Sequence, residues 1–184
     1  MPRKDLGRRA LVEDIVERQM RRHSTAAVLL HHAIAERLGL GPTDHKCLDV
    51  IRERGAMTGS ELAAVTGVTT GAITGVVARL ELAGYLHRAP DPHDGRKQIL
   101  SPNPERLRDI SEVFAPVRED AAKLLDRFDS HQLTAIAEFL ASSTESIYHR
   151  AAVLRAQAAL GPEAGAANPT GKRGAGHARA THSH

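Results

Sequence analysis

The 184-residue sequence predicts a mainly helical fold with one small β-hairpin. Apolar residues recur at helical spacing along most of the chain, and the longest stretches of this kind lie near its two ends. Between residues 84 and 101 the pattern changes to two short strand-like runs on either side of a Pro-Asp-Pro-His-Asp-Gly segment. An Asp-Gly pair between such runs is typical of a hairpin turn.

A long amphipathic helix is predicted at the N-terminal end, over residues 6–38. Its apolar positions are Leu11, Ile15, Val28, Leu29, Leu30, Ile34 and Leu38. The glycines and the proline of residues 39–42 end this helix, because both residue types interrupt helical backbone. A second helix is expected to begin with Thr43 as its N-cap residue and to end at Gly55.

Two shorter helices separated by a tight turn are predicted next. Thr58 and Glu61 have the spacing of a capping box, and Gly67 can end the first helix in the left-handed conformation. The following helix begins near Thr69 or Thr70. Its predicted core face carries Ile73, Val76, Val77 and Leu80. Its opposite face is small and polar and carries Thr70, Gly71, Thr74, Gly75, Ala78 and Arg79.

This order of helix, turn, helix and charged hairpin predicts a winged helix-turn-helix that binds double-stranded DNA. Small side chains let a helix lie deep in the major groove, where threonine methyl groups can contact thymine. The hairpin carries Arg88, Arg96 and Lys97, whose charges suit phosphate contacts. Gly71 and Gly75 each cost about 1 kcal/mol of helix stability relative to alanine. Either close approach to DNA or neutral drift would explain them.

The segment from Val68 to Ser101 resembles the signature of the MarR family of bacterial transcription regulators. The residues that carry the resemblance are Arg79-Leu80-Glu81, Gly84, Arg88 and Asp91-Pro92-His93-Asp94-Gly95-Arg96. The resemblance implies that Asp94 braces Arg96, that Arg96 enters the minor groove, and that residues 69–79 face the major groove. The DNA-binding residues expected are therefore Thr69, Thr70, Gly71, Thr74, Gly75, Arg79, Arg88, Asp94, Arg96 and Lys97.

The sequence departs from the family pattern at two places. Position 75, where the family often has a larger polar or basic residue, is glycine, which indicates sparse base reading. The usual leucine-threonine after the second strand is replaced by residues 101–104, in which Asn103 can still cap a helix that begins at Pro104. The family tendency is repression, with release from DNA on binding a small-molecule effector, and we expect the same of this chain.

Two more helices and a tail are predicted after the hairpin. The first runs from Pro104 to about Phe128, and Pro116 inside it should kink or break it. Ser130 is expected to cap a long final helix. We divide the chain into an N-terminal dimerisation helix (1–42), a winged helix-turn-helix domain (43–103), C-terminal dimerisation helices (104–160) and a disordered basic tail (161–184).

The long end helices predict a homodimer. A helix of about 30 residues spans ~45 Å, more than so small a domain can cover, so part of its apolar stripe would be exposed in a monomer. A two-fold axis would present two recognition helices to a pseudo-palindromic operator whose half-site centres lie roughly 10 base pairs apart. The alternative is a monomeric helical bundle with frayed ends.

Histidines cluster where the resemblance places the effector cleft. The residues expected there are His31, His32, His45 and Phe114. Imidazole and thiolate are zinc ligands, but His45 and Cys47 lie about 200° apart around a helix and cannot easily hold one ion. His32 and Glu36, four residues apart, could share one. Cys47 is most simply a small core residue, and we expect no dedicated metal site and no cofactor.

Composition and motifs exclude several other classes. The net charge is only +3, so a basic surface has to come from clustering, and a single cysteine excludes an intramolecular disulfide framework. With no signal peptide and no run of about 18 apolar residues, we expect a cytoplasmic protein without a membrane partner. The phosphate-loop, serine-elbow and His-x-x-x-His motifs are missing, so we expect no enzyme. A zinc-sensing winged-helix regulator and a winged-helix protein-interaction module are the alternatives.

Overall fold

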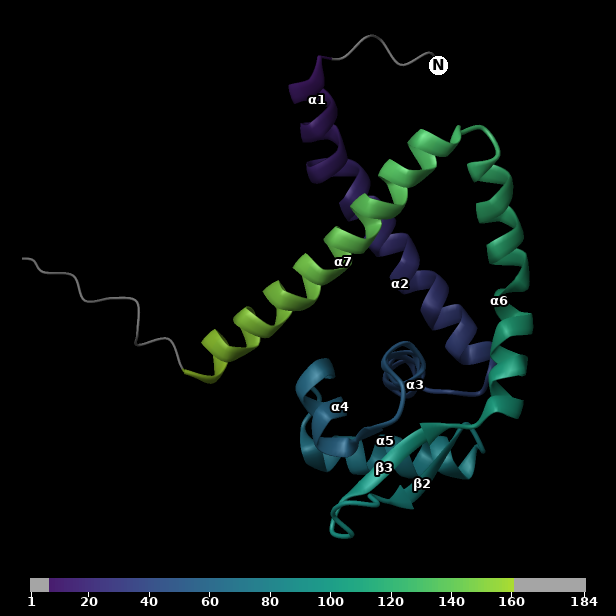
Figure 1. Cartoon of the computed structure of the whole chain (residues 1–184), viewed down its shortest axis with the longest axis vertical. Coiled ribbons are helices and arrows are strands. Elements are labelled where there is room, and N and C mark those ends of the chain that lie inside the picture. The colour runs from purple at the N-terminus through teal and green to yellow at the C-terminus, as the bar shows by residue number, and fades with distance from the viewer. Residues whose placement is uncertain (1–6, 161–184) are drawn as a thin grey trace, which may run out of the picture. The chain divides into compact units, whose positions relative to one another are not determined.

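The computed structural model describes residues 7–160, shown in Figure 1. The predicted disordered tail, residues 161–184, lies outside the described residues. The chain divides into two compact units, Met1–Ile136 and Ala137–His184. The first unit holds the hairpin, the core and the helices that precede residue 130. No single helix within residues 7–160 is long and apolar enough to span a membrane, although α4 (Gly59–Thr66) and α5 (Thr70–Leu82) pass that test as a pair bent by 113°.

The N-terminal helix is continuous but not entirely α-helical. It consists of α1 (Arg8–Glu13), the π-helical segment η1 (Asp14–Gln19) and α2 (Met20–Arg37). The π turn places Gln19 beside Asp14, and the Gln19 amide donates a hydrogen bond to the Asp14 carboxylate at 3.0 Å. The predicted helix is confirmed, whereas the periodicity of its apolar residues did not reveal the π segment.

The second helix, α3 (Pro42–Arg54), begins two residues earlier than a Thr43 cap would give. Its N-cap residue is Gly41, with Pro42 at the first helical position, and no side chain caps it. The prediction of Thr43 as the cap was wrong. Proline suits the first helical position because its missing N–H would have no partner there, so it starts this helix without a polar cap.

The two short helices, α4 (Gly59–Thr66) and α5 (Thr70–Leu82), form as predicted. The capping box is complete: the Glu61 N–H donates to Thr58 Oγ1 at 3.2 Å, and the Thr58 N–H donates to Glu61 Oε2 at 2.7 Å. Gly67 ends α4 with φ 76° and ψ 8°, the left-handed conformation that glycine adopts without steric cost. Thr69 caps α5 by accepting from the Ala72 N–H at 3.3 Å.

The hairpin is part of a three-stranded antiparallel sheet with the order β1-β3-β2. Its arms are β2 (Leu86–Pro90) and β3 (Gln98–Pro102), with Arg88 opposite Leu100. The third strand, β1 (Met57–Thr58), precedes α4 and pairs Met57 with Leu100. The sequence did not predict β1, because two residues are too few to show the alternation that identifies a strand.

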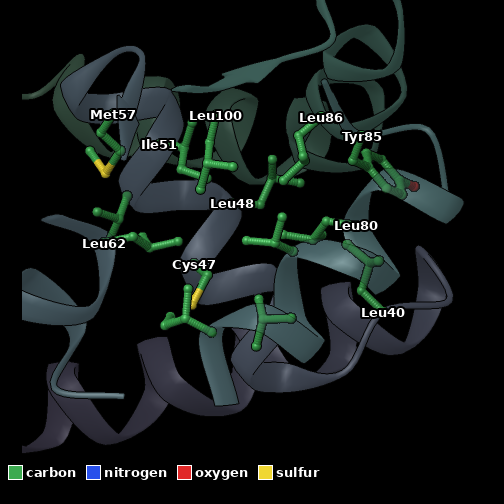
Figure 2. Close-up of a cluster of buried hydrophobic side chains, with 14 of the residues drawn as sticks. Leu40, Cys47, Leu48, Ile51, Met57, Leu62, Leu80, Tyr85, Leu86 and Leu100 are labelled. Carbon is green, nitrogen blue, oxygen red and sulfur yellow. The ribbon is translucent and has the colours of Figure 1, made fainter. Parts of the chain in front are cut away.

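The core of the first unit packs α3, α4 and α5 against the sheet, as Figure 2 shows. Within this core cluster, four leucine and isoleucine side chains have no exposed surface: Leu48, Ile51, Leu62 and Leu80. The predicted inner face of α5 is confirmed, since Ile73, Val76 and Val77 are also buried. Cys47 is 1% exposed and belongs to this cluster, as expected. The packing fixes the orientation of α5 and leaves its opposite face exposed.

Helix α6 (Pro104–Leu125) is capped by Asn103, which accepts from the Glu105 N–H at 3.0 Å, as predicted. Pro116 does not break it. The Arg118 guanidinium donates to the Ser111 carbonyl at 2.8 Å, a hydrogen bond from a side chain to the backbone in the turn before the proline.

The last helix, α7 (Ser130–Ala159), extends from the first unit into the second. Its cap is Asp129 instead of the predicted Ser130. The Gln132 N–H donates to the Asp129 carboxylate at 2.8 Å, and the Asp129 N–H donates to Gln132 Oε1 at 3.0 Å. This reciprocal pair is a capping box in which aspartate and glutamine replace the usual threonine and glutamate.

Candidate nucleic-acid interface

The exposed face of α5 is small and carries little charge. Thr70, Gly71, Thr74 and Ala78 are exposed, and Gly75 is half-buried. Thr74 Oγ1 donates to the Thr70 carbonyl at 3.1 Å, which leaves its methyl group and its oxygen lone pairs available. Thr69 differs from the others, because its hydroxyl oxygen is already the helix cap. Because its side chains are small, a helix with this face can lie deep in a groove.

The two glycines of α5 have different surroundings. A Cβ atom added at Gly71 would meet nothing within 4 Å. A Cβ atom added at Gly75 would lie 3.3 Å from Nη1 of Arg79, so that side chain would have to move. The packing of the folded chain therefore does not require glycine at position 71.

The tip of the hairpin is held by two aspartates. Asp91 Oδ1 accepts from the backbone N–H groups of His93 at 2.8 Å and Asp94 at 3.3 Å. Asp94 Oδ1 accepts from the Arg96 N–H at 3.2 Å, and the Lys97 N–H donates to the Asp94 carbonyl at 2.8 Å. These bonds close the turn and fix the backbone from which Arg96 projects.

The Asp94 carboxylate thus binds the backbone N–H of Arg96 and does not contact the Arg96 guanidinium. The ammonium group that faces Asp94 belongs to Lys97, with Nζ 3.6 Å from Asp94 Oδ2. Within residues 7–160, no hydrogen bond or ion pair engages the Arg96 guanidinium. Arg96 is exposed at the end of the wing, and its charge and its planar set of donors are available to an anion.

The other two predicted arginines are paired within the chain. Arg88 Nη2 donates to Glu81 Oε2, which lowers the pKa of Glu81. Arg79 donates from Nε to Asp44 Oδ2 at 2.8 Å and from Nη2 to Asp44 Oδ1 at 2.7 Å. Asp44 is 4% exposed, so a buried carboxylate on α3 holds the arginine of the recognition helix. Sequence reasoning missed this pair because its members lie 35 positions apart.

A second group of candidate residues joins α2, α3 and α6. The His31 ring centroid lies 5.4 Å from that of His45 and 5.7 Å from that of Phe114. Asp49 Oδ2 lies 3.4 Å from His31 Nδ1 and 3.6 Å from His45 Nδ1. Burial lowers the pKa of both histidines, although Asp49 opposes the shift.

Asp49 was not among the predicted residues, although its position four residues after His45 places both on one helix face. His32, which was predicted to share the cleft, is exposed and has no place in this group; Glu36 is exposed as well. A separate open pocket of about 470 Å³ contains none of the predicted cleft residues. Its lining consists of Arg37, Leu38, Tyr85, Arg106, Asp109, Glu112 and Val113.

Comparison with known proteins shows that the chain is similar to bacterial transcription regulators. A model of the MarR family matches residues 38–97. An uncharacterised HTH-type transcriptional regulator of Bacillus subtilis, YcgE, is 36% identical over 137 residues, which cover 74% of this chain and 89% of that protein.

Two solved structures extend the match to the fold. A MarR family protein of Bacillus stearothermophilus has a TM-score of 0.60 at 20% identity, covering 77% of this chain and 98% of its own. The transcriptional regulator Tm0710 of Thermotoga maritima has a TM-score of 0.54 at 25% identity, covering 73% and 94%.

Proposed function

The chain belongs to the MarR family and is a DNA-binding transcription regulator, and from this we propose that it is a homodimeric, non-enzymatic repressor. The operator we propose is a pseudo-palindrome, bound by two copies of α5 in successive major grooves and two wings in the flanking minor grooves. Binding of a small-molecule effector would release the repressor from this operator.

The observation that carries the DNA-binding surface is the contrast between α5 and the wing. The exposed face of α5 is small, and its arginine, Arg79, is already paired with Asp44. Among the three predicted arginines, Arg96 is the one whose guanidinium has no partner within residues 7–160, and it stands on a turn braced by Asp94. We infer that α5 reads base edges by close approach, whereas Arg96 supplies a phosphate or minor-groove contact. A module built to bind an acidic protein would need more free charge on α5.

The proposed homodimer is supported by exposed apolar side chains on the end helices. In the first unit they are Leu11, Val12, Ile15, Val16, Val28, Leu29, Leu30, Leu124 and Leu125. In the second unit they are Phe139, Leu140, Ile147 and Leu154. Apolar surface of this extent on helices is typical of an interface. The isologous contact of two copies would cover it without leaving an open end.

The effector site we propose lies at His31, His45 and Phe114. These rings converge from three helices, and α3, which carries His45, also carries Asp44, the partner of Arg79. A ligand that shifts α3 would therefore act on the recognition helix through one ion pair.

The DNA-binding surface can be tested by fluorescence anisotropy with duplexes selected from a random pool. Arg96→Ala should weaken binding to selected and unrelated duplexes alike and should lower the salt dependence by about one charge. Thr74→Ala should change which sequences are preferred and leave the salt dependence unaltered. Arg21→Ala, which removes the same charge from an exposed position on α2, is the control and should leave binding nearly unchanged.

Asp94→Ala tests the bracing of the wing. Removing a carboxylate near DNA should strengthen binding by simple electrostatics, whereas loss of the hydrogen bond to the Arg96 N–H should weaken it. We expect the second effect to prevail. Tighter binding by Asp94→Ala would exclude a bracing role.

A further inference from the structure

His31, His45 and Asp49 have the geometry of a metal site. One ligand atom from each lies within 4.8 Å of the other two. In a tetrahedral zinc site with bonds of about 2.0–2.1 Å, the ligand atoms stand about 3.4 Å apart. The observed separations of Asp49 Oδ2 from the two Nδ1 atoms, 3.4 Å and 3.6 Å, are close to this distance between ligand atoms. Small rotations of the side chains would complete the arrangement.

The two imidazoles also contain polar atoms that the protein does not satisfy. His31 Nδ1 and His45 Nε2 are buried, and neither has a hydrogen-bond partner among residues 7–160. His45 is 1% exposed. Buried polar atoms without partners are rare in folded proteins because desolvating them is unfavourable. An ion bound by His31 Nδ1, His45 Nδ1 and Asp49 Oδ2 would give the first of these unpartnered nitrogens a partner.

The donor set selects the class of ion. Two imidazole nitrogens and one carboxylate oxygen suit zinc and its neighbours in the first transition row, whereas magnesium and calcium prefer oxygen ligands. The thiol of Cys47 belongs to the core cluster with Leu48 and Ile51, so it is not a fourth ligand. Three protein ligands leave one position for water or a small anion.

Two cations compete with an ion for Asp49. Lys46 Nζ lies 3.5 Å from Oδ2, and Arg52 Nη1 lies 3.4 Å from Oδ1. The Lys46 side chain is 57% exposed, so it can turn into solvent when an ion arrives. Arg52 contacts the other oxygen and can keep the carboxylate oriented.

We propose that His31, His45 and Asp49 bind a divalent transition-metal ion, for which zinc is the test ion, and that this ion is the effector of the chain. Metal binding itself does not depend on the proposed repression, whereas the effector role does. The ion would tie α2 to α3, next to the Asp44 carboxylate that holds Arg79 on α5.

Direct binding is measured by titrating the metal-free full-length protein with zinc by calorimetry, and with cobalt(II) by its visible absorption. His31→Ala should weaken binding at this site by more than the roughly 10–100-fold that loss of a residue supporting a metal ligand costs. His32→Ala is the matched control, because it removes an exposed histidine one position away, and it should bind like the wild type. His177, His182 and His184 stay in every variant, so metal held by them cancels in the comparison.

Thermal unfolding of the wild type gives a readout that does not depend on the folding of variants. Zinc at a hundredfold excess over its dissociation constant should raise Tm by about 5–10 °C. Asp49→Asn, which preserves the shape of the side chain, should lose most of that rise. Equal zinc binding by His31→Ala and His32→Ala, or an unchanged Tm in the wild type, would overturn the site.

The effector role needs a separate measurement. DNA affinity of the wild type is compared with zinc and with a chelator, and Asp49→Asn serves as the control that should no longer respond. If zinc binds but DNA affinity is unchanged, the ion is structural and the effector role is wrong. If DNA binding is missing under both conditions, the proposed function fails and the metal site stands.

Discussion

Gly71 distinguishes the demands of folding from those of DNA binding. Because an added methyl group meets no atom within 4 Å, Gly71→Ala should raise the free energy of unfolding by about 1 kcal/mol, the helix-propensity difference. The same methyl group should weaken DNA binding if α5 lies deep in the groove. Urea denaturation and anisotropy measure the two effects. Gly75→Ala should stabilise less, because Arg79 has to move. Unweakened DNA binding by Gly71→Ala would show that α5 does not approach the bases closely at this position.

Cys47 should be unreactive in the folded protein. Burial, with the nearby Asp44 carboxylate, raises the pKa of its thiol to about 11, so at pH 8 only about one thiol in a thousand is ionised. We expect alkylation by iodoacetamide to be slow in buffer and fast in denaturant, as followed by mass spectrometry. Since the unfolded thiol ionises at a lower pH than the folded one, this group's contribution to stability is complete below about pH 9 and decreases as pH rises toward 11. Rapid alkylation of the native protein would contradict the core assignment.

The Asp44–Arg79 pair connects α3 with α5, and its two members should respond unequally to mutation. Arg79→Ala leaves a carboxylate that is 4% exposed without its partner, whereas Asp44→Ala leaves an arginine whose side chain is 58% exposed to water. We therefore expect Arg79→Ala to lower Tm by several degrees and Asp44→Ala to lower it less. The variant with both substitutions should be more stable than Arg79→Ala, because it contains no buried carboxylate without a partner. The reverse order of the two single variants would mean that the pair does not hold α5 in this way.

At the scale of the whole molecule, the exposed apolar side chains of the long helices predict which substitutions should disrupt the homodimer. Leu29 is 64% exposed on α2, and in a two-fold dimer a Leu29→Glu change would occur twice. Since burying one leucine contributes roughly 1.5–3 kcal/mol, we expect the dimer to dissociate at micromolar concentration in sedimentation experiments. Leu82→Glu makes the same chemical change at a position that is 90% exposed on α5, and it should leave the dimer intact. Identical sedimentation of the two variants would place the interface elsewhere.

The sequence by itself determined the local elements, because their signals lie within a few residues of one another. The Thr58–Glu61 capping box, the left-handed Gly67, the apolar face of α5 and the Asn103 cap all appear in the structure as predicted. Local rules failed where two neighbouring residues could each serve as the N-cap of the same helix. Gly41 and Pro42 start α3 in place of Thr43, and Asp129 caps α7 in place of Ser130. The strand β1 and the π segment were too short to produce a periodic signal.

Only the tertiary structure decided which side chains act together, because those contacts join positions far apart in the chain. Packing of α3 against α5 pairs Arg79 with Asp44, and Arg88 is paired with Glu81. Arg96 is therefore the unpaired one of the three arginines predicted to contact DNA. Packing of α2 against α3 brings His31 to His45 and Asp49 and leaves the adjacent His32 exposed. Helical periodicity can place a residue on a face, but the partner on that face depends on how the helices pack, which no spacing within one helix specifies.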